Sequence, residues 1–170
     1  MQEAIKNKLP IRIDLRPNRD EVHSGICLKM TKEIFVLVCY NNELKEYDGY
    51  AILRSYEIER FKYWEKWELA EIKNDNFGAF DDILPLNKMN TLHDCLLALK
   101  SNKLISVYTE VFEDSYFVGR IVDVTASTVE LQLISDEIEW IDNEVINIDK
   151  ITYIGFDSAY EKDFIKTLYK

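Results

Sequence analysis

The chain has 170 residues, of which 47% are hydrophobic, and its formal net charge is −10. This apolar fraction can build a packed core, and the scarcity of glycine (5) and proline (3) excludes collagen-like and low-complexity sequences. No apolar run approaches the length of a membrane-spanning helix, and the N-terminus has no apolar stretch of signal-peptide length. We therefore expect a soluble, cytoplasmic globular protein.

The first part of the chain, residues 1–73, predicts a short helix followed by five strands. The helix is expected at 3–7, and Ile11, Ile13 and Leu15 then alternate as in a strand. The later strands are expected at 24–30, at 34–40, up to a turn at Asp48-Gly49, and at 51–61. Gly25 lies inside the second strand, where glycine indicates a bulge or a sharp bend.

The last part of the chain, residues 90–170, predicts the same series of elements. Thr91 and Asp94 form a T-x-x-D cap before an apolar helical stripe of Leu92, Cys95, Leu96 and Leu99. The strands are expected at 105–107, at 118–124, at 129–134, up to a turn at Asp142-Asn143, and at 145–154. Ser158 and Glu161 form an S-x-x-E capping box for a C-terminal helix, and the matching segment of the first part is 64–73.

An internal repeat explains this similarity. A shift of 94 residues aligns Gly25 with Gly119 and Leu37 with Leu131, and after Asp48 the shift becomes 93. We read the two parts as duplicated copies, with chance agreement between two β-rich halves as the alternative. Residues 74–89 between the copies are expected to be a linker, and their apolar side chains predict that it packs against the rest of the protein.

Catalytic and metal-binding motifs are absent from the sequence. The three cysteines, at 27, 39 and 95, have neither a disulfide framework nor metal-ligand spacing. His93 and Cys95 would point to different faces of a helix. We find no nucleophile motif, P-loop or dinucleotide fingerprint. We therefore expect no enzyme activity, no cofactor and no metal site, and keep a small hydrolase only as a third function class.

A helix followed by five short, strongly bent strands resembles the Sm-like small barrel, and other SH3-like barrels share this alternation. The first part of the two-part Sm pattern resembles 119–121 with 131–133, and 25–27 with 37–39. The second part resembles 146–154 and 53–61. The resemblance implies a mainly β protein with short helices, made of two tandem Sm-like or SH3-like barrels at 1–73 and 90–170.

The residues that bind RNA in the Sm family are mostly replaced in this chain. The family's Asp position carries Thr31 and Thr125, its Asn position carries Phe35 and Val129, and its Arg-Gly pair becomes Arg54-Ser55 and Asn147-Ile148. Only Arg54 matches. The resemblance therefore does not bring the uridine pocket with it, since a shared fold does not imply a shared function.

Negative charge is concentrated in the second copy. Residues 110–149 hold eleven acidic residues and one base, Arg120. Such a surface repels phosphates, which supply most of the affinity for nucleic acids. It indicates either an acidic face for a basic partner, with Glu137, Glu139, Asp142 and Glu144 as the candidate contacts, or a solvated exterior that favours solubility.

A second candidate surface lies in the first copy, where basic and aromatic residues are interleaved. Its candidate contacts are Arg54, Lys62, Trp64 and Trp67. This pattern suits single-stranded nucleic acid, but five acids in residues 54–73 balance five bases. Packing of the aromatics on the barrel or the other copy, and a protein interface, are the other interpretations.

The function we expect is a non-enzymatic protein-interaction module whose acidic second copy meets an unidentified partner with a basic face. The alternative is an Sm-like RNA-binding protein that uses the first copy. Nucleic acid is the less favoured partner, and no membrane association is expected. Exposed edge strands of the two copies could pair internally, so we expect a monomer or a dimer. The aromatics of 63–67 are the predicted contact between the copies.

Overall fold

The computed structural model describes residues 1–15, 22–43, 45–65, 84–100, 104–109 and 116–168. These residues form a mainly β protein with one antiparallel ten-stranded sheet, whose strand order is β5-β1-β2-β3-β4-β10-β6-β7-β8-β9. The expectation of a mainly β chain with short helices is confirmed. No helix among the described residues is both long and apolar enough to cross a membrane.

The described residues of each half form five strands. The first half comprises α1 (Gln2–Asn7), β1 (Pro10–Leu15), β2 (Val22–Met30), β3 (Ile34–Asn41), β4 (Glu46–Arg54), the 3-10 turn η1 (Ser55–Glu57) and β5 (Ile58–Tyr63). The second half comprises α3 (Leu92–Leu99), β6 (Leu104–Thr109), β7 (Tyr116–Val124), β8 (Thr128–Ile134), β9 (Trp140–Asn147), the 3-10 turn η2 (Ile148–Lys150), β10 (Ile151–Phe156) and α4 (Ala159–Leu168).

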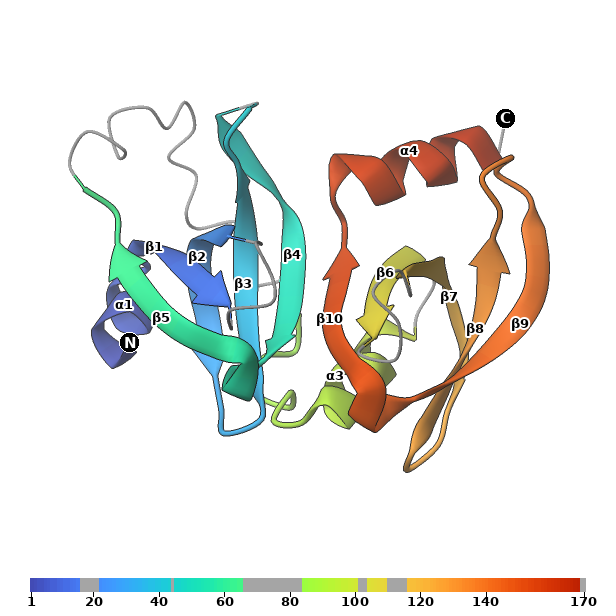
Figure 1. Ribbon diagram of the computed structural model, residues 1–170, viewed down its shortest axis with the longest axis horizontal. Helices are drawn as coiled ribbons and strands as arrows, with labels where there is room; N and C mark the ends of the chain where they lie inside the picture. Colours follow the sequence, from blue (N-terminus) through green and yellow to red (C-terminus); the bar gives the residue numbers. More distant parts are fainter. Residues whose placement is uncertain (16–21, 44, 66–83, 101–103, 110–115, 169–170) are drawn as a thin grey trace.

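The two halves lie side by side and meet where β4 runs antiparallel to β10 (Figure 1). Tyr50 to Leu53 of β4 pair with Tyr153 to Phe156 of β10, so the sheet continues from one half into the other. The expected internal pairing of edge strands is therefore observed. It leaves β5 and β9 as the two outer strands of the sheet.

Strand pairing has the same register in both halves. Gly25 faces Cys39 in the β2–β3 pair, and Gly119 faces Leu133 in the β7–β8 pair, each 94 residues further on. The register also shifts at equivalent positions within these two pairs. The offset found in the sequence therefore relates the pairing of the two halves as well as their residue types.

The one-residue difference between the halves lies in a hairpin turn. Tyr40 pairs with Tyr47 and Ile134 with Trp140, so the offset is already 93 at Tyr47. The prediction that it changes after Asp48 is wrong by a few residues. A turn can lose a residue without changing the pairing, whereas a loss within a strand would turn the following side chains to the opposite face.

The expected turns at Asp48-Gly49 and Asp142-Asn143 are also wrong, because β4 and β9 run through them. The chain turns instead at η1 and η2, which contain neither glycine nor proline. Gly49 has another role. Its φ is +74°, and a Cβ there would lie 2.7 Å from the backbone nitrogen of Ser158, so this glycine lets the start of α4 approach β4.

One apolar cluster among the described residues contains many side chains of both halves. Val36 and Ile52 of the first half pack in the same cluster as Leu96 and Ile154 of the second. Leu84 and Met89 are buried in it as well, so the described end of the predicted linker packs as expected. The two halves therefore share their core, as two small units would if neither could bury enough surface alone.

The predicted aromatic contact between the halves is wrong where the structure describes it. Tyr63 ends β5 at the outer edge of the sheet and is exposed, because β5 pairs only with β1. The apolar contact between the halves is made by aliphatic side chains of the shared cluster and by Tyr50 and Phe156, whose rings stack at 5.2 Å. Trp67, the predicted helical segment beyond residue 65 and the linker up to residue 83 lie outside the described residues.

Candidate protein-interaction surface

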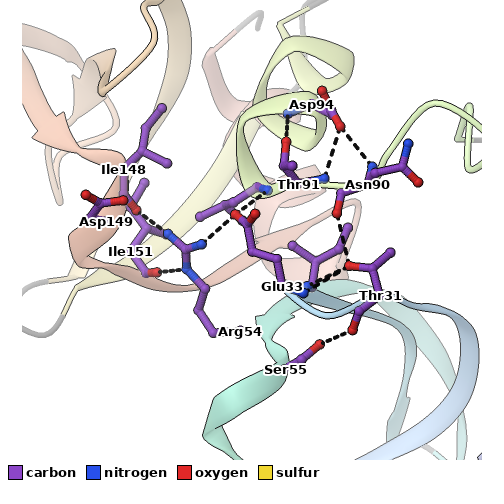
Figure 2. Close-up of polar contacts among 12 residues, drawn as sticks. Thr31, Glu33, Arg54, Ser55, Asn90, Thr91, Asp94, Ile148, Asp149 and Ile151 are labelled. Atoms are coloured by element: carbon purple, nitrogen blue, oxygen red, sulfur yellow. Dashed lines mark hydrogen bonds and ion pairs between the residues drawn. The ribbon is translucent and has the colours of Figure 1, made fainter.

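Arg54, the one residue that matches the RNA-binding pattern, lies inside the junction between the halves. Only 6% of its surface is exposed. Its guanidinium crosses from the end of β4 to the second half, where Nε donates to the carbonyl of Ile151 at 3.0 Å and Nη2 to that of Ile148 at 2.6 Å (Figure 2). Its third nitrogen, Nη1, donates to Oε1 of Glu33 at 2.7 Å. The side chain is therefore occupied by protein groups.

Glu33 extends this junction to helix α3. The same Oε1 atom that pairs with Arg54 accepts the backbone N–H of Leu92 at 2.9 Å, at the first turn of the helix (Figure 2). The predicted cap is also formed, with Thr91 and Asp94 bonded to each other's backbone N–H groups. The backbone N–H of Asn90 donates to Asp94, which lowers the pKa of that carboxyl. The sequence did not single out Glu33, since its partners are far away along the chain.

The other candidates of the first half do not gather into one site. Lys62 is exposed on β5. Trp64 is half-buried and makes an edge-to-face contact with Tyr40, with ring centroids 4.7 Å apart. Trp67 lies outside the described residues. Arg54 is therefore separated by burial from Lys62, and the two cannot bind one exposed ligand.

The candidates of the second half lie along one outer strand of the sheet. Glu137 and Glu139 are exposed in the turn that leads into β9, and Asp142 and Glu144 are exposed on β9 itself. We call these four residues the acidic edge. Within the part of the chain that the structure describes, no ion pair joins any of them to a base.

Apolar side chains accompany the charges of the acidic edge. Ile141 is 47% exposed and Val145 is 60% exposed, and both lie on β9. The one base of residues 110–149, Arg120, contacts the first residue of β9. The guanidinium of Arg120 stacks 4.6 Å from the ring of Trp140, and its Nε donates to Gln132. Strand β9 therefore offers backbone, apolar and acidic groups together at the end of the sheet.

A buried polar cluster in the second half attaches helix α4 to the sheet. Glu161 is buried and accepts the hydroxyl of Ser106 at 2.5 Å and the backbone N–H of Ser158 at 2.9 Å, the latter as its predicted capping box requires. The hydroxyl of Tyr116 donates to Ser106, and burial raises the pKa of Tyr116. Because Ser106 and Glu161 are both enclosed, the cluster serves to position the helix.

The three cysteines lie in environments that keep their thiols protonated. Burial raises the pKa of Cys27, Cys39 and Cys95 to about 12, so the thiols stay protonated near neutral pH. His23 stacks on Tyr153 with ring centroids 5.4 Å apart. No group of three His, Cys, Asp or Glu residues suited to a metal ion occurs among the described residues.

Comparison of the chain with protein-family models, with curated proteins and with solved structures finds no match in any of the three.

Proposed function

We propose that this chain is a non-enzymatic protein-interaction module that binds an extended basic segment of a partner along β9. In this proposal the two halves are tandem small-barrel units of Sm-like or SH3-like type, joined at β4 and β10. The observation that carries the proposal is the chemistry of β9, an outer strand on which Ile141, Asp142, Glu144 and Val145 are all exposed.

An outer strand of this kind has the groups that strand addition uses. One backbone edge of β9 pairs with no other described strand, so it can bond to an added strand, and alternate side chains then give specificity. Glu144 and Val145 are neighbours in the regularly paired part of β9, so their side chains lie on opposite faces of the strand, while Ile141 and Asp142 lie where its register with β8 shifts. A segment with lysine or arginine on one face and apolar residues on the other complements both.

The RNA-binding alternative depends on β5. Arg60 and Lys62 alternate there with the exposed rings of Phe61 and Tyr63, a combination that can bind single-stranded nucleic acid by phosphate contacts and stacking. Arg54, the family-like residue, contributes nothing to this surface because its nitrogens are bonded inside the junction.

The test compares two fluorescent probes, a peptide of alternating lysine and valine and a poly-U oligonucleotide, by anisotropy at low salt. The proposal expects the peptide to bind and a glutamate–valine peptide of the same length to fail. Asp142→Lys with Glu144→Lys should weaken peptide binding at least tenfold, because it replaces attraction by repulsion across the added strand. Glu3→Lys, at an exposed acid on α1, is the matched control and should change little.

Two results would overturn the proposal. The first is peptide binding that the β9 variant leaves unchanged, which would make the acidic edge a solvated surface only. The second is poly-U binding that weakens with salt and is lost in Lys62→Glu, together with no peptide binding. That result would favour the RNA-binding alternative.

A further inference from the structure

The two halves of the chain are joined by antiparallel pairing of one strand from each half. Strand β4 of the first half pairs with β10 of the second, with Ile52 opposite Ile154 and Ala51 opposite Gly155. Ile52 and Ile154 are each 0% exposed and pack in the apolar cluster that both halves share. The repeat places β9 at the position equivalent to β4, and β5 at the position equivalent to β10, 93 residues apart in each case.

These two equivalent strands are the two that end the sheet. In the internal junction, β4 and β10 pair through the edges that face each other. Among the described strands, nothing pairs with the equivalent edge of β9 or with the equivalent edge of β5. The residue equivalent to Ile52 is Val145, which is 60% exposed, and the residue equivalent to Ile154 is Phe61, which is 37% exposed. Each half thus carries an open counterpart of a surface that the junction covers.

The register of the junction, transferred to β9 and β5, aligns complementary residues. It places Val145 opposite Phe61, two exposed apolar side chains. It places Glu144 opposite Lys62, two exposed side chains of opposite charge. Apolar and opposite-charge pairs directly across an antiparallel ladder are both stabilising.

We propose that β9 of one molecule pairs with β5 of a second copy of this chain, in the register of the β4–β10 junction. This inference rests on the proposed function, since it names the partner segment of the acidic edge. The contact joins different surfaces of the two molecules, so each dimer keeps one open β9 and one open β5. A dimer is the first species formed, and longer head-to-tail assemblies follow at higher concentration.

The contact is weaker than the internal junction, because it lacks a counterpart of the buried Arg54, which bonds to two carbonyls across the junction and pairs with Glu33. Asn147 and Ser127 stand at the positions equivalent to Arg54 and Glu33. Asn147 is exposed and its side chain accepts the backbone N–H of Asp149 instead. The association between molecules therefore depends on strand pairing, one apolar pair and one charge pair, and it is reversible and sensitive to salt.

The experiment measures the mass of the purified full chain by sedimentation equilibrium, over about 1 to 300 µM and at about 20 and 500 mM salt. The wild type should form dimers and larger species at low salt and dissociate at high salt. Glu144→Lys and Lys62→Glu should each weaken the association about tenfold, since each places like charges opposite one another.

Mixing the Glu144→Lys and Lys62→Glu variants gives the sharpest readout. In the mixture, the lysine introduced on β9 of one variant faces the glutamate introduced on β5 of the other. The remaining contact again pairs Glu144 with Lys62, so association should return to near the wild-type strength.

A second variant adds the missing ion pair to the contact between molecules. Ser127→Glu with Asn147→Arg should strengthen association, because the introduced arginine can reach the carbonyls of Ser55 and Ile58 in the second copy. These two carbonyls are the equivalents of those of Ile148 and Ile151, which Arg54 binds in the internal junction.

The inference is overturned if the wild type stays monomeric across these conditions, or if the mixed variants associate no better than each alone. Its failure differs from failure of the proposed function. A monomeric chain that still binds the lysine–valine peptide at β9 would refute self-association and keep the interaction module. If the chain self-associates with the expected charge dependence but does not bind the peptide, the partner of the acidic edge is a second copy of the chain and not another basic segment.

Discussion

Replacing Arg54 by alanine should cost the protein much of its stability. The change removes three hydrogen bonds of a charged group. Two of them are donated to the carbonyls of Ile148 and Ile151, and both of these residues are buried. A hydrogen bond to a charged group is worth about 1.5 to 3 kcal/mol. The ion pair with Glu33 adds less, since the Glu33 side chain is 37% exposed. The two bonds across the junction sum to about 3 to 6 kcal/mol. We expect a loss of about 3 to 5 kcal/mol in the free energy of unfolding, as is usual when a buried charged contact is broken.

Urea unfolding followed by tryptophan fluorescence and circular dichroism measures this loss. The repeat supplies the control, because Asn147 occupies the equivalent position but is exposed and makes one local bond. Asn147→Ala should cost about 1 kcal/mol or less. Arg54→Lys should recover less than half of the stability, since an ammonium cannot reproduce the planar fork of three bonds. A loss below about 1 kcal/mol for Arg54→Ala, equal to that of Asn147→Ala, would refute the role of Arg54 in the junction.

Three further changes test other parts of the structure. Gly25→Ala should destabilise the protein by about 2 to 3 kcal/mol in urea unfolding, because the Cβ of the introduced alanine would lie 1.8 Å from the carbonyl oxygen of Val38. A change near zero in the free energy of unfolding would contradict the close approach of β2 and β3. Glu161→Ala should lower the free energy of unfolding by about 1 to 3 kcal/mol, since Ser106 and the N–H of Ser158 lose their acceptor. The control Asp163→Ala, on the exposed face of α4, should lower it by under about 0.5 kcal/mol; equal effects would argue against the buried cluster. At pH 8 the native thiols should react with iodoacetamide far more slowly than those of the urea-unfolded chain, because burial raises their pKa from 9.0 to about 12; rapid native labelling would show that the cysteines are accessible. The free energy of unfolding should also fall as the pH rises above 9, because the thiols ionise in the unfolded chain before they ionise in the native one.

Local patterns predicted most of the individual elements. The alternation of Ile11, Ile13 and Leu15 marks β1, and the cap formed by Thr91 and Asp94 marks the start of α3, because both signals depend on neighbours in the sequence. The offset of 94 found in the sequence also relates strand pairing in the two halves. The turns η1 and η2 were missed because no glycine or proline marks them.

Contacts between distant residues could not be predicted in the same way. Arg54 looked like a ligand-binding residue because its type fits a motif, yet its environment is decided by β10, about 97 residues further along the chain. One signal did exist in the repeat. Arg54 and Glu33 both change between the halves, to Asn147 and Ser127, which is what the loss of a paired interaction would leave. The acidic edge was found from charge alone, because exposed residues keep the properties that the sequence shows.

The shared apolar cluster has a consequence for how the chain unfolds. Leu84 and Met89 precede the second half in sequence, yet they are packed among side chains from both halves. A chain cut between the halves would leave β4 and β10 with apolar faces open to water, and each fragment would lose part of the core that holds it together. The repeat is therefore a unit of architecture but not a unit of cooperativity, and the whole chain should lose its structure in a single transition.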